Sequence, residues 1–259
     1  MQVFEFNSAI VRAVPRSVVG GLRAADLGSP NFSGVVGEHT AYLRALENAG
    51  VSVEMLPSLE AYPDSVFVED TALVFSGAAI VLRPGAPTRS GEAAEIAPAL
   101  ERRFNRVLRL EQGFVDGGDV LRTPRGVFIG QSARTDAQGA RALISLLAEI
   151  GLHGSAVETP QGVLHFKSDC ALLDEESILS TARLAASGVF EGFRIVMVPE
   201  DEEGAANAVR VNDQVLISDT YPRTAELLAE AGYKTVPLAT REIAKIDAGL
   251  SCLSLRWRE

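Results

Sequence analysis

Short apolar runs rich in β-branched residues alternate with longer amphipathic stretches along the whole chain. The short runs are bounded by glycine, proline, asparagine or aspartate, which is typical of strands. The longer stretches carry apolar residues at three- and four-residue spacing, which predicts helices. We expect helices at residues 37–49, 91–103, 136–150, 181–186, 222–231 and 240–245. This alternation of strands and helices predicts an α/β fold.

Three segments repeat one arrangement, in which a helix end is followed by a glycine and then by a strand: ENAGVSVEMLP, AEIGLHGSAVETP and AEAGYKTVPLA. A glycine at this place is a common left-handed stop of a helix. The copies recur at intervals of roughly 80 to 100 residues, which indicates a repeated ββαβ unit rather than one continuous sheet. No serine- or proline-rich linker interrupts the chain, so we expect one domain over residues 1–259.

Composition narrows the class of protein. The chain is 47% hydrophobic and 22% charged, and its net charge of −10 comes without a lysine or arginine cluster, so we expect no nucleic-acid partner. No apolar run reaches the roughly 18 to 20 residues that span a bilayer, so we expect no membrane partner. The N-terminal segment lacks the basic-then-apolar order of a signal peptide, which favours a cytoplasmic enzyme. Two cysteines, Cys170 and Cys252, are too few for a disulfide scaffold.

Two segments carry residues suited to nucleophilic and proton-transfer chemistry. In LHFKSDC, a strand at residues 163–168 would place His165 and Lys167 on one face, whereas Cys170 precedes an apolar run and resembles a buried hydrophobe. In DAGLSCLSLRW, Cys252 lies at a turn that enters a strand, where a thiol can be held with its sulfur exposed. Local context alone favours a structural role for each of these residues.

Acidic residues gather in YPDSVFVEDTALVF. A strand at residues 65–68 would put Asp64 and Asp70 on one face and Glu69 on the other. Acids are unfavourable in strands, and an adjacent pair after an apolar run is costly unless a cation compensates it. The segment is therefore compatible with either a cation site or a solvated strand end.

A second acidic segment is FVDGGDVL, where Asp116 and Asp119 bracket a glycine pair ahead of a strand expected at residues 118–121. The ligand spacings of a calcium loop and of a zinc site are both missing here, so we expect no metal. Further along, Thr135 with a glutamine three positions later resembles a capping box that starts the next helix.

Taken together, the order and spacing of these segments resemble the dimethylarginine dimethylaminohydrolase family. The resemblance runs along nearly the whole chain and includes AIVRAVPRS, PDSVFVEDTALV, LRPGAPTR, VDGGDVL, RTDAQGA, LHFKS, the AAN at 205–207 and IDAGLSC. It implies a five-bladed α/β propeller of ββαβ units around a central polar channel. That fold agrees with the repeat found in the sequence.

The resemblance also implies roles for individual residues. Cys252 would be the nucleophile and His165 the general acid and base, in a catalytic group that includes Asp116. Asp70 and Asp116 would hold a guanidinium, with support from Glu69. The remaining substrate-binding residues would be Arg89 and Arg134 for a carboxylate, and Asp64 with the backbone of Leu22 and Ile246 for an α-amino group.

The implied activity is hydrolysis of Nω-methylated arginine to citrulline plus dimethylamine or methylamine, through a covalent intermediate on Cys252. No organic cofactor or metal ion would be needed, the partner would be the small-molecule substrate, and a homodimer stays open. Within the superfamily the alternatives are an arginine deiminase, which usually carries an inserted helical domain, an agmatine deiminase and an amidinotransferase. A silent protein that only binds arginine derivatives is the alternative from another class. Residues 23–36 would suit either a mobile lid or an inert surface loop.

Overall fold

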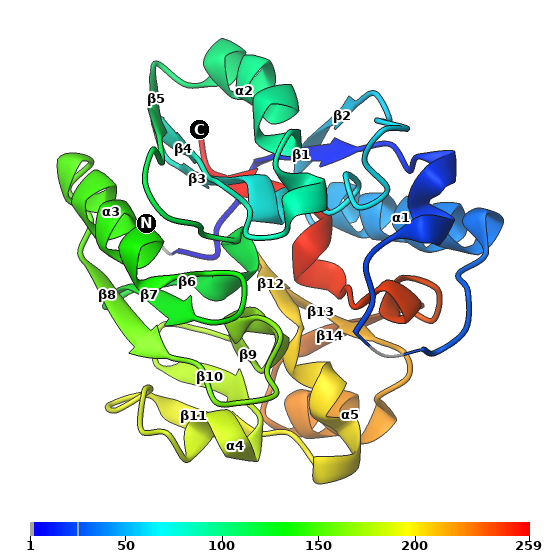
Figure 1. Ribbon diagram of the computed structural model, residues 1–259. Coiled ribbons are helices and arrows are strands. Elements are labelled where there is room, and N and C mark those ends of the chain that lie inside the picture. Colours follow the sequence, from blue (N-terminus) through cyan, green and yellow to red (C-terminus); the bar gives the residue numbers. More distant parts are fainter. Residues whose placement is uncertain (1–2, 25) are drawn as a thin grey trace.

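The β-strands of the computed structural model form five three-stranded sheets arranged around a common centre (Figure 1). The structure describes residues 3–24 and 26–259. In each sheet the middle strand runs antiparallel to one neighbour and parallel to the other. In spatial order, the sheets are β15 (Leu255–Trp257), β1 (Ser8–Arg12) and β2 (Ser52–Leu56); β3 (Ala72–Phe75), β4 (Ala78–Val81) and β5 (Arg106–Arg109); β6 (Val120–Thr123), β7 (Gly126–Gln131) and β8 (Gly154–Glu158); β9 (Cys170–Leu172), β10 (Ser177–Ser180) and β11 (Arg194–Met197); and β12 (Val209–Val211), β13 (Gln214–Ser218) and β14 (Lys234–Leu238).

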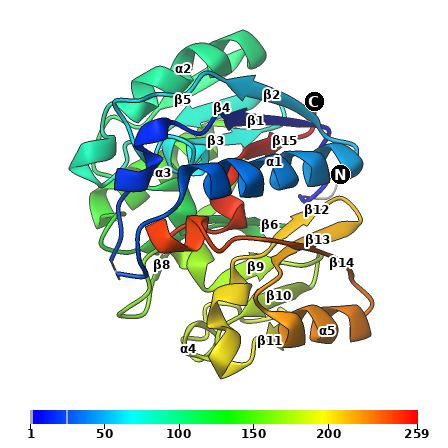
Figure 2. The same cartoon turned by 90° about the vertical axis from the view of Figure 1, so that its right-hand side faces the viewer.

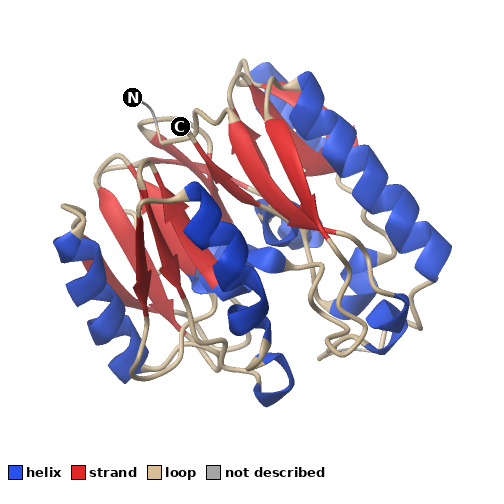
Figure 3. Cartoon of the chain, turned by 90° about the horizontal axis from the view of Figure 1, so that it is seen from above, coloured by secondary structure: helices blue, strands red, loops and turns tan. Residues whose placement is uncertain are grey.

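A helix links the two parallel strands of each sheet, because parallel neighbours need a crossover connection. These helices are α1 (Phe32–Asn48), α2 (Glu92–Arg103), α3 (Ala137–Glu149), α4 (Ala182–Ala185) and α5 (Pro222–Glu230). They lie on the outer sides of the sheets, away from the common centre (Figures 1 and 3). The repeated order of two strands, a helix and a strand confirms the predicted α/β propeller. No helix in the described part of the chain is long and apolar enough to cross a membrane.

Two predicted helix boundaries are wrong. Helix α1 begins at Phe32 rather than at residue 37, because the side chain of Asn31 caps it by accepting a hydrogen bond from the backbone of Gly34 at 3.1 Å. Residues 32–36 of the loop expected at 23–36 are therefore helical, and Ala25 lies outside the described residues. The helix expected at 240–245 is instead a short 3₁₀ turn, Ile243–Ile246.

The two ends of the chain meet in one sheet. Strand β15, near the C-terminus, pairs antiparallel with β1, with Trp257 opposite Ser8 and Leu255 opposite Ile10 (Figure 2). This pairing completes the fifth sheet with residues that are far apart in sequence. It also draws the segment just before β15, which carries Cys252, to the centre of the molecule.

A 3₁₀ turn precedes the first strand of each sheet. The five turns are Val68–Thr71, Gly117–Asp119, Phe166–Ser168, Glu200–Ala206 and Leu250–Leu253. Those from neighbouring sheets pack against one another. The strands expected at residues 65–68 and 163–168, and the beginning of the one expected at 118–121, are therefore wrong. A short apolar run does not distinguish a strand from a buried turn, and these residues bond across the centre rather than along a sheet.

Candidate active site

A small cavity of about 40 Å³ lies among these central turns. Nine of the ten predicted site residues line it: Leu22, Asp64, Asp70, Arg89, Asp116, Arg134, His165, Ile246 and Cys252. Four residues that the sequence did not single out complete the wall, namely Phe67, Leu164, Asp247 and Ala248. The tenth predicted residue, Glu69, lines a different cavity. Residues from distant parts of the chain thus converge as predicted, although three of the segments that carry them are turns rather than strands.

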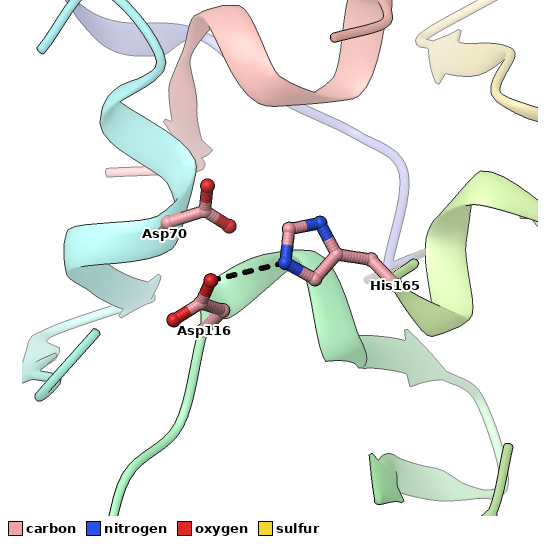
Figure 4. A group of neighbouring side chains, drawn as sticks. All are labelled: Asp70, Asp116 and His165. Carbon is pink, nitrogen blue, oxygen red and sulfur yellow. Dashed lines mark hydrogen bonds and ion pairs between the residues drawn. The ribbon is translucent and has the colours of Figure 1, made fainter. Parts of the chain in front are cut away.

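Two buried carboxylates and an imidazole form the core of the cavity. Ligand atoms of Asp70, Asp116 and His165 all lie within 4.8 Å of one another (Figure 4). His165 Nε2 lies 3.0 Å from Asp116 Oδ2, and the backbone N–H of Gly85 donates to Asp116 Oδ1 at 2.7 Å. On the facing side, the backbone N–H of Gly118 donates to Asp70 Oδ1 at 2.9 Å. These bonds hold both carboxylates in fixed orientations.

The charges around His165 set its protonation. Burial alone would lower the pKa of the imidazole, but Asp70, the hydrogen bond to Asp116 and the charge of Asp119 raise it to about 9. His165 is therefore an imidazolium at neutral pH, and its Nε2–H donates to Asp116. A protonated imidazole in a cavity is suited to proton donation.

The glycine pair of FVDGGDVL is required by close approaches between turns. A Cβ at Gly118 would lie 2.8 Å from His165 Nδ1 and 3.0 Å from Asp70 Oδ1. A Cβ at Gly117 would lie 1.9 Å from the carbonyl oxygen of Glu69. The residues flanking this pair can reach Asp70 and His165 only because neither glycine has a side chain.

Asp119 holds the turn that follows His165 and was not predicted as a site residue. Its Oδ1 accepts from the backbone N–H of Phe166 at 2.8 Å, while its Oδ2 accepts from the hydroxyls of Ser132 and Thr135 at 2.7 and 2.6 Å. Thr135 is therefore not the helix cap that the sequence predicted, and the cap of α3 is Asp136. Phe166, fully buried in an apolar cluster, anchors the same turn.

Cys252 lies in the turn Leu250–Leu253 and is almost completely buried. Burial, reinforced by the charges of Glu69 and Asp70, raises the pKa of its thiol to about 12, so the resting group is a neutral thiol. The turn is held by Asn207 of the neighbouring blade, whose Oδ1 accepts from the backbone N–H of Ser251 at 3.1 Å. This contact gives a structural role to the AAN segment of the sequence.

The two arginines of the cavity differ in what they already bind. Arg89 is buried: its Nη1 lies 2.5 Å from Asp70 Oδ2, its Nε and Nη2 donate to Glu92, and Nη2 also donates to the carbonyl of Phe67. Arg89 thus neutralises Asp70 within a network. Arg134 is half-buried and its charge acts on Asp64 and Asp247, but within the described ranges no hydrogen bond or ion pair is found for its guanidinium. Carboxylate binding by Arg89 stays a prediction, whereas Arg134 has its donors available.

Asp64 also lines the cavity. Its Oδ1 accepts from the backbone N–H of Leu22 at 2.9 Å, and burial raises the pKa of its carboxyl group. Nearby, Asp247 adopts a left-handed backbone with φ of 55° and accepts a hydrogen bond from the backbone of Ala24. Asp247 was missed in the sequence because a single acid in a turn carries no distinguishing pattern.

Lys167 and Glu69 do not line this cavity. The predicted strand would have put Lys167 beside His165, but the 3₁₀ turn sends Lys167 to the opposite side, where its Nζ lies 2.6 Å from Glu69 Oε1. As expected, the side chain of Glu69 faces the opposite side from those of Asp64 and Asp70. Cys170 is buried, as predicted, and its thiol donates to the carbonyl of Phe166.

The set formed by Asp70, Asp116 and His165 has the spacing of a metal site, but its chemistry fits a metal poorly. A histidine must be neutral to bind a metal, and a pKa of about 9 opposes that state near neutral pH. One Asp70 oxygen is also occupied by Arg89. The two carboxylates are better suited to an organic cation.

Comparison with known proteins places the chain in a family. No family model matches it. It is 41% identical over 254 residues to the N(G),N(G)-dimethylarginine dimethylaminohydrolase of Pseudomonas aeruginosa, over 97% of this chain and 100% of that protein. The protein of the same name from Streptomyces coelicolor is 34% identical over 221 residues, covering 85% and 84% of the two chains.

Among solved structures, the enzyme of P. aeruginosa in a cysteine-to-serine form complexed with citrulline superposes with a TM-score of 0.95, at 41% identity and over 98% of this chain and all of that one. Both sequence and fold are therefore similar over the full length, and the segments that carry the central turns fall inside the matched region. The chain belongs to the dimethylarginine dimethylaminohydrolase family.

Proposed function

We propose that the protein hydrolyses Nω-methylated arginine, asymmetric dimethylarginine or monomethylarginine, to citrulline and dimethylamine or methylamine. One observation carries the proposal. A thiol, an imidazolium and two fixed carboxylates, Asp70 and Asp116, line one cavity, whose wall also holds a third acid and an arginine for which no hydrogen bond or ion pair is found among the described residues. That arrangement matches a guanidinium at one end of a substrate and a carboxylate with an amino group at the other.

Binding of the guanidinium supplies the first part of catalysis. Asp70 and Asp116 would hold the planar cation with its central carbon towards Cys252, so that attack becomes effectively unimolecular. The same cation compensates the acidic charges that raise the pKa of the thiol. Substrate therefore favours loss of the thiol proton to solvent, which gives the thiolate, the attacking form.

Proton transfer by His165 completes the reaction in two halves. The thiolate sulfur forms a bond to the guanidinium carbon, and the electron pair of one C–N bond moves onto nitrogen. His165 then donates its proton to the methylated nitrogen, which departs as the amine and leaves an S-alkylthiouronium on Cys252. The neutral His165 next takes a proton from water as the water oxygen bonds to the same carbon. The C–S bond then breaks with its electron pair on sulfur, which returns the thiolate, and the hydroxyl proton of the adduct passes to solvent as citrulline forms.

Arg134 and Asp64 would bind the other end of the substrate. The available guanidinium of Arg134 suits a carboxylate, and the buried Asp64 suits an α-amino group. Arg89 has five N–H groups, most of them already bonded to protein acceptors, so its main contribution is to fix Asp70. A free amino acid is therefore favoured over a substrate without a carboxylate, such as agmatine.

Hydrolysis of unmethylated arginine is the second candidate, because the same groups would serve it. The test is incubation of the protein with asymmetric dimethylarginine, monomethylarginine and arginine, with citrulline and the released amine assayed in each. We expect citrulline from the methylated substrates, loss of turnover in Cys252→Ser, and retained turnover in the matched control Cys170→Ser. Equal turnover of arginine would contradict the substrate assignment, and full activity of Cys252→Ser would contradict the mechanism.

A further inference from the structure

A second cavity, of about 150 Å³, lies on the other side of the same central turns. It is lined by first strands of the sheets and by Val3, Phe4 and Phe6 of the N-terminal segment. Three turns divide the two cavities, because each contributes neighbouring residues to both sides. The residue pairs, with the member facing the second cavity first, are Glu69 and Asp70, Lys167 and His165, and Ser251 and Cys252.

The charges that line this cavity are strongly unbalanced. Four cationic side chains and one acid belong to its wall: Arg122, Lys167, Arg210 and Arg256, with Glu69. The single carboxylate is already shared, since Glu69 Oε1 lies 2.6 Å from Lys167 Nζ and 3.5 Å from Arg256 Nη2. A chain of net charge −10 thus encloses a cavity with a positive excess.

Arg122 carries the uncompensated charge, whereas the charges of Asp174 and Asp213 act on Arg210. The Arg122 guanidinium stacks over Phe75, 5.4 Å from the ring centroid, and across residues 3–24 and 26–259 no hydrogen bond or ion pair is found for it. The Arg210 guanidinium stacks over Phe4 at 5.2 Å, and its Nε donates to the carbonyl of Asn212. Burial lowers the pKa of both arginines. A half-buried cation without a matching anion gains free energy when an anion binds.

The rest of the wall is mostly apolar, with Ser251 and Ser254 as its polar members. Side chains from several first strands face the cavity, including Leu73, Phe75, Leu121, Leu172 and Leu255. An inorganic anion would leave this surface uncovered, whereas an apolar group attached to a carboxylate would cover it.

We propose that this second cavity is a binding site for a small organic monoanion, a carboxylate carried on a compact apolar body, with the carboxylate paired to Arg122. The ligand would not enter the catalytic cavity, because the three shared turns separate the two. The site is therefore independent of the proposed hydrolysis and needs no turnover to be detected.

Isothermal titration calorimetry of the intact protein with benzoate tests the site, with benzamide as the uncharged isostere. We expect saturable binding of benzoate, at least about tenfold weaker binding of benzamide, and no competition by saturating citrulline. Arg122→Gln should weaken benzoate binding by about tenfold or more, whereas Arg122→Lys, which keeps the charge, should retain most of it. The matched control is Arg134→Gln, an arginine of the catalytic cavity, which should bind benzoate as the parent does.

Several outcomes would overturn the proposal. They are absence of saturable benzoate binding, equal binding of benzamide, displacement by citrulline, or loss of binding in Arg134→Gln with binding retained in Arg122→Gln. Far-ultraviolet circular dichroism of each variant shows whether the protein is folded, so that a loss of binding is not confused with unfolding. Should Arg122→Gln fail to fold, benzoate binding by Arg122→Lys together with its persistence in Arg134→Gln still decides between the two cavities.

Discussion

Replacement of Asp116 by asparagine should lower the pKa of His165 without changing the shape of the site. The amide oxygen of Asn can still accept from the backbone N–H of Gly85, which now donates to Asp116 Oδ1 at 2.7 Å. What disappears is the negative charge 3.0 Å from His165 Nε2. Burial then opposes the imidazolium with one counter-charge fewer.

The magnitude follows from the strength of a charge-assisted hydrogen bond, about 1.5 to 3 kcal/mol. Since about 1.4 kcal/mol corresponds to one pH unit, the pKa of His165 should fall from about 9 to between about 7 and 8. The remaining charges of Asp70 and Asp119 keep it above the ordinary value. The parent should also lose stability as pH rises. A pKa raised in the folded state contributes about 3 kcal/mol that is complete below pH 6.5 and disappears as pH rises through about 9.

Long-range ¹H–¹⁵N correlation spectra of histidine-labelled protein measure this pKa directly. The chain has three histidines, so His165→Gln assigns the signal. Burial lowers the pKa of His39 to about 4, which keeps its titration apart. Asp213→Asn, which removes an exposed acid, is the matched control and should leave the titration of His165 unchanged. A His165 that titrates near 6.5 in the parent, or at the same pH in Asp116→Asn, would refute the electrostatic reasoning.

Two further substitutions test the scaffold of the site. Gly118→Ala places a methyl group 2.8 Å from His165 Nδ1 and 3.0 Å from Asp70 Oδ1, so we expect kcat to fall at least about tenfold. Urea titrations should show that the free energy of unfolding drops by about 1 to 3 kcal/mol. Kinetics equal to those of the parent would contradict the close packing. Arg89→Gln leaves the buried carboxylates of Asp70 and Glu92 unpaired, so the free energy of unfolding should drop by about 3 to 5 kcal/mol, and a loss below about 1 kcal/mol in urea titrations would show that the network is not stabilising.

Local sequence patterns predicted the outer part of the molecule well. Helix α2 ends at Arg103, where the sequence predicts its end, and helix α3 lies within the predicted range 136–150. These elements follow from hydrophobic spacing and from the glycines that stop helices, which act over a few residues. The repeated ββαβ unit could be predicted from the sequence for the same reason.

Local sequence patterns did not predict the central turns. The apolar run before Glu69 and the run around His165 have the composition of strands, yet each leads into a 3₁₀ turn that packs on turns from other sheets. Their conformation is set by partners dozens of residues away. Glycines 117 and 118 were visible in the sequence, but the reason for them, contact with Glu69 and His165, was not.

The chemistry of the site was also determined in part by the sequence and in part by the tertiary structure. Sequence alone supplied Cys252, His165 and the acids as residue types in order, and the family resemblance supplied their expected roles. The tertiary structure determined that Asp70 is already paired with Arg89 and that Asp119 holds the turn of His165. It also determined which residue of each turn faces which cavity. Charge and burial depend on distances between segments remote in sequence, so local pattern cannot encode them, and only the closed ring of sheets brings them together.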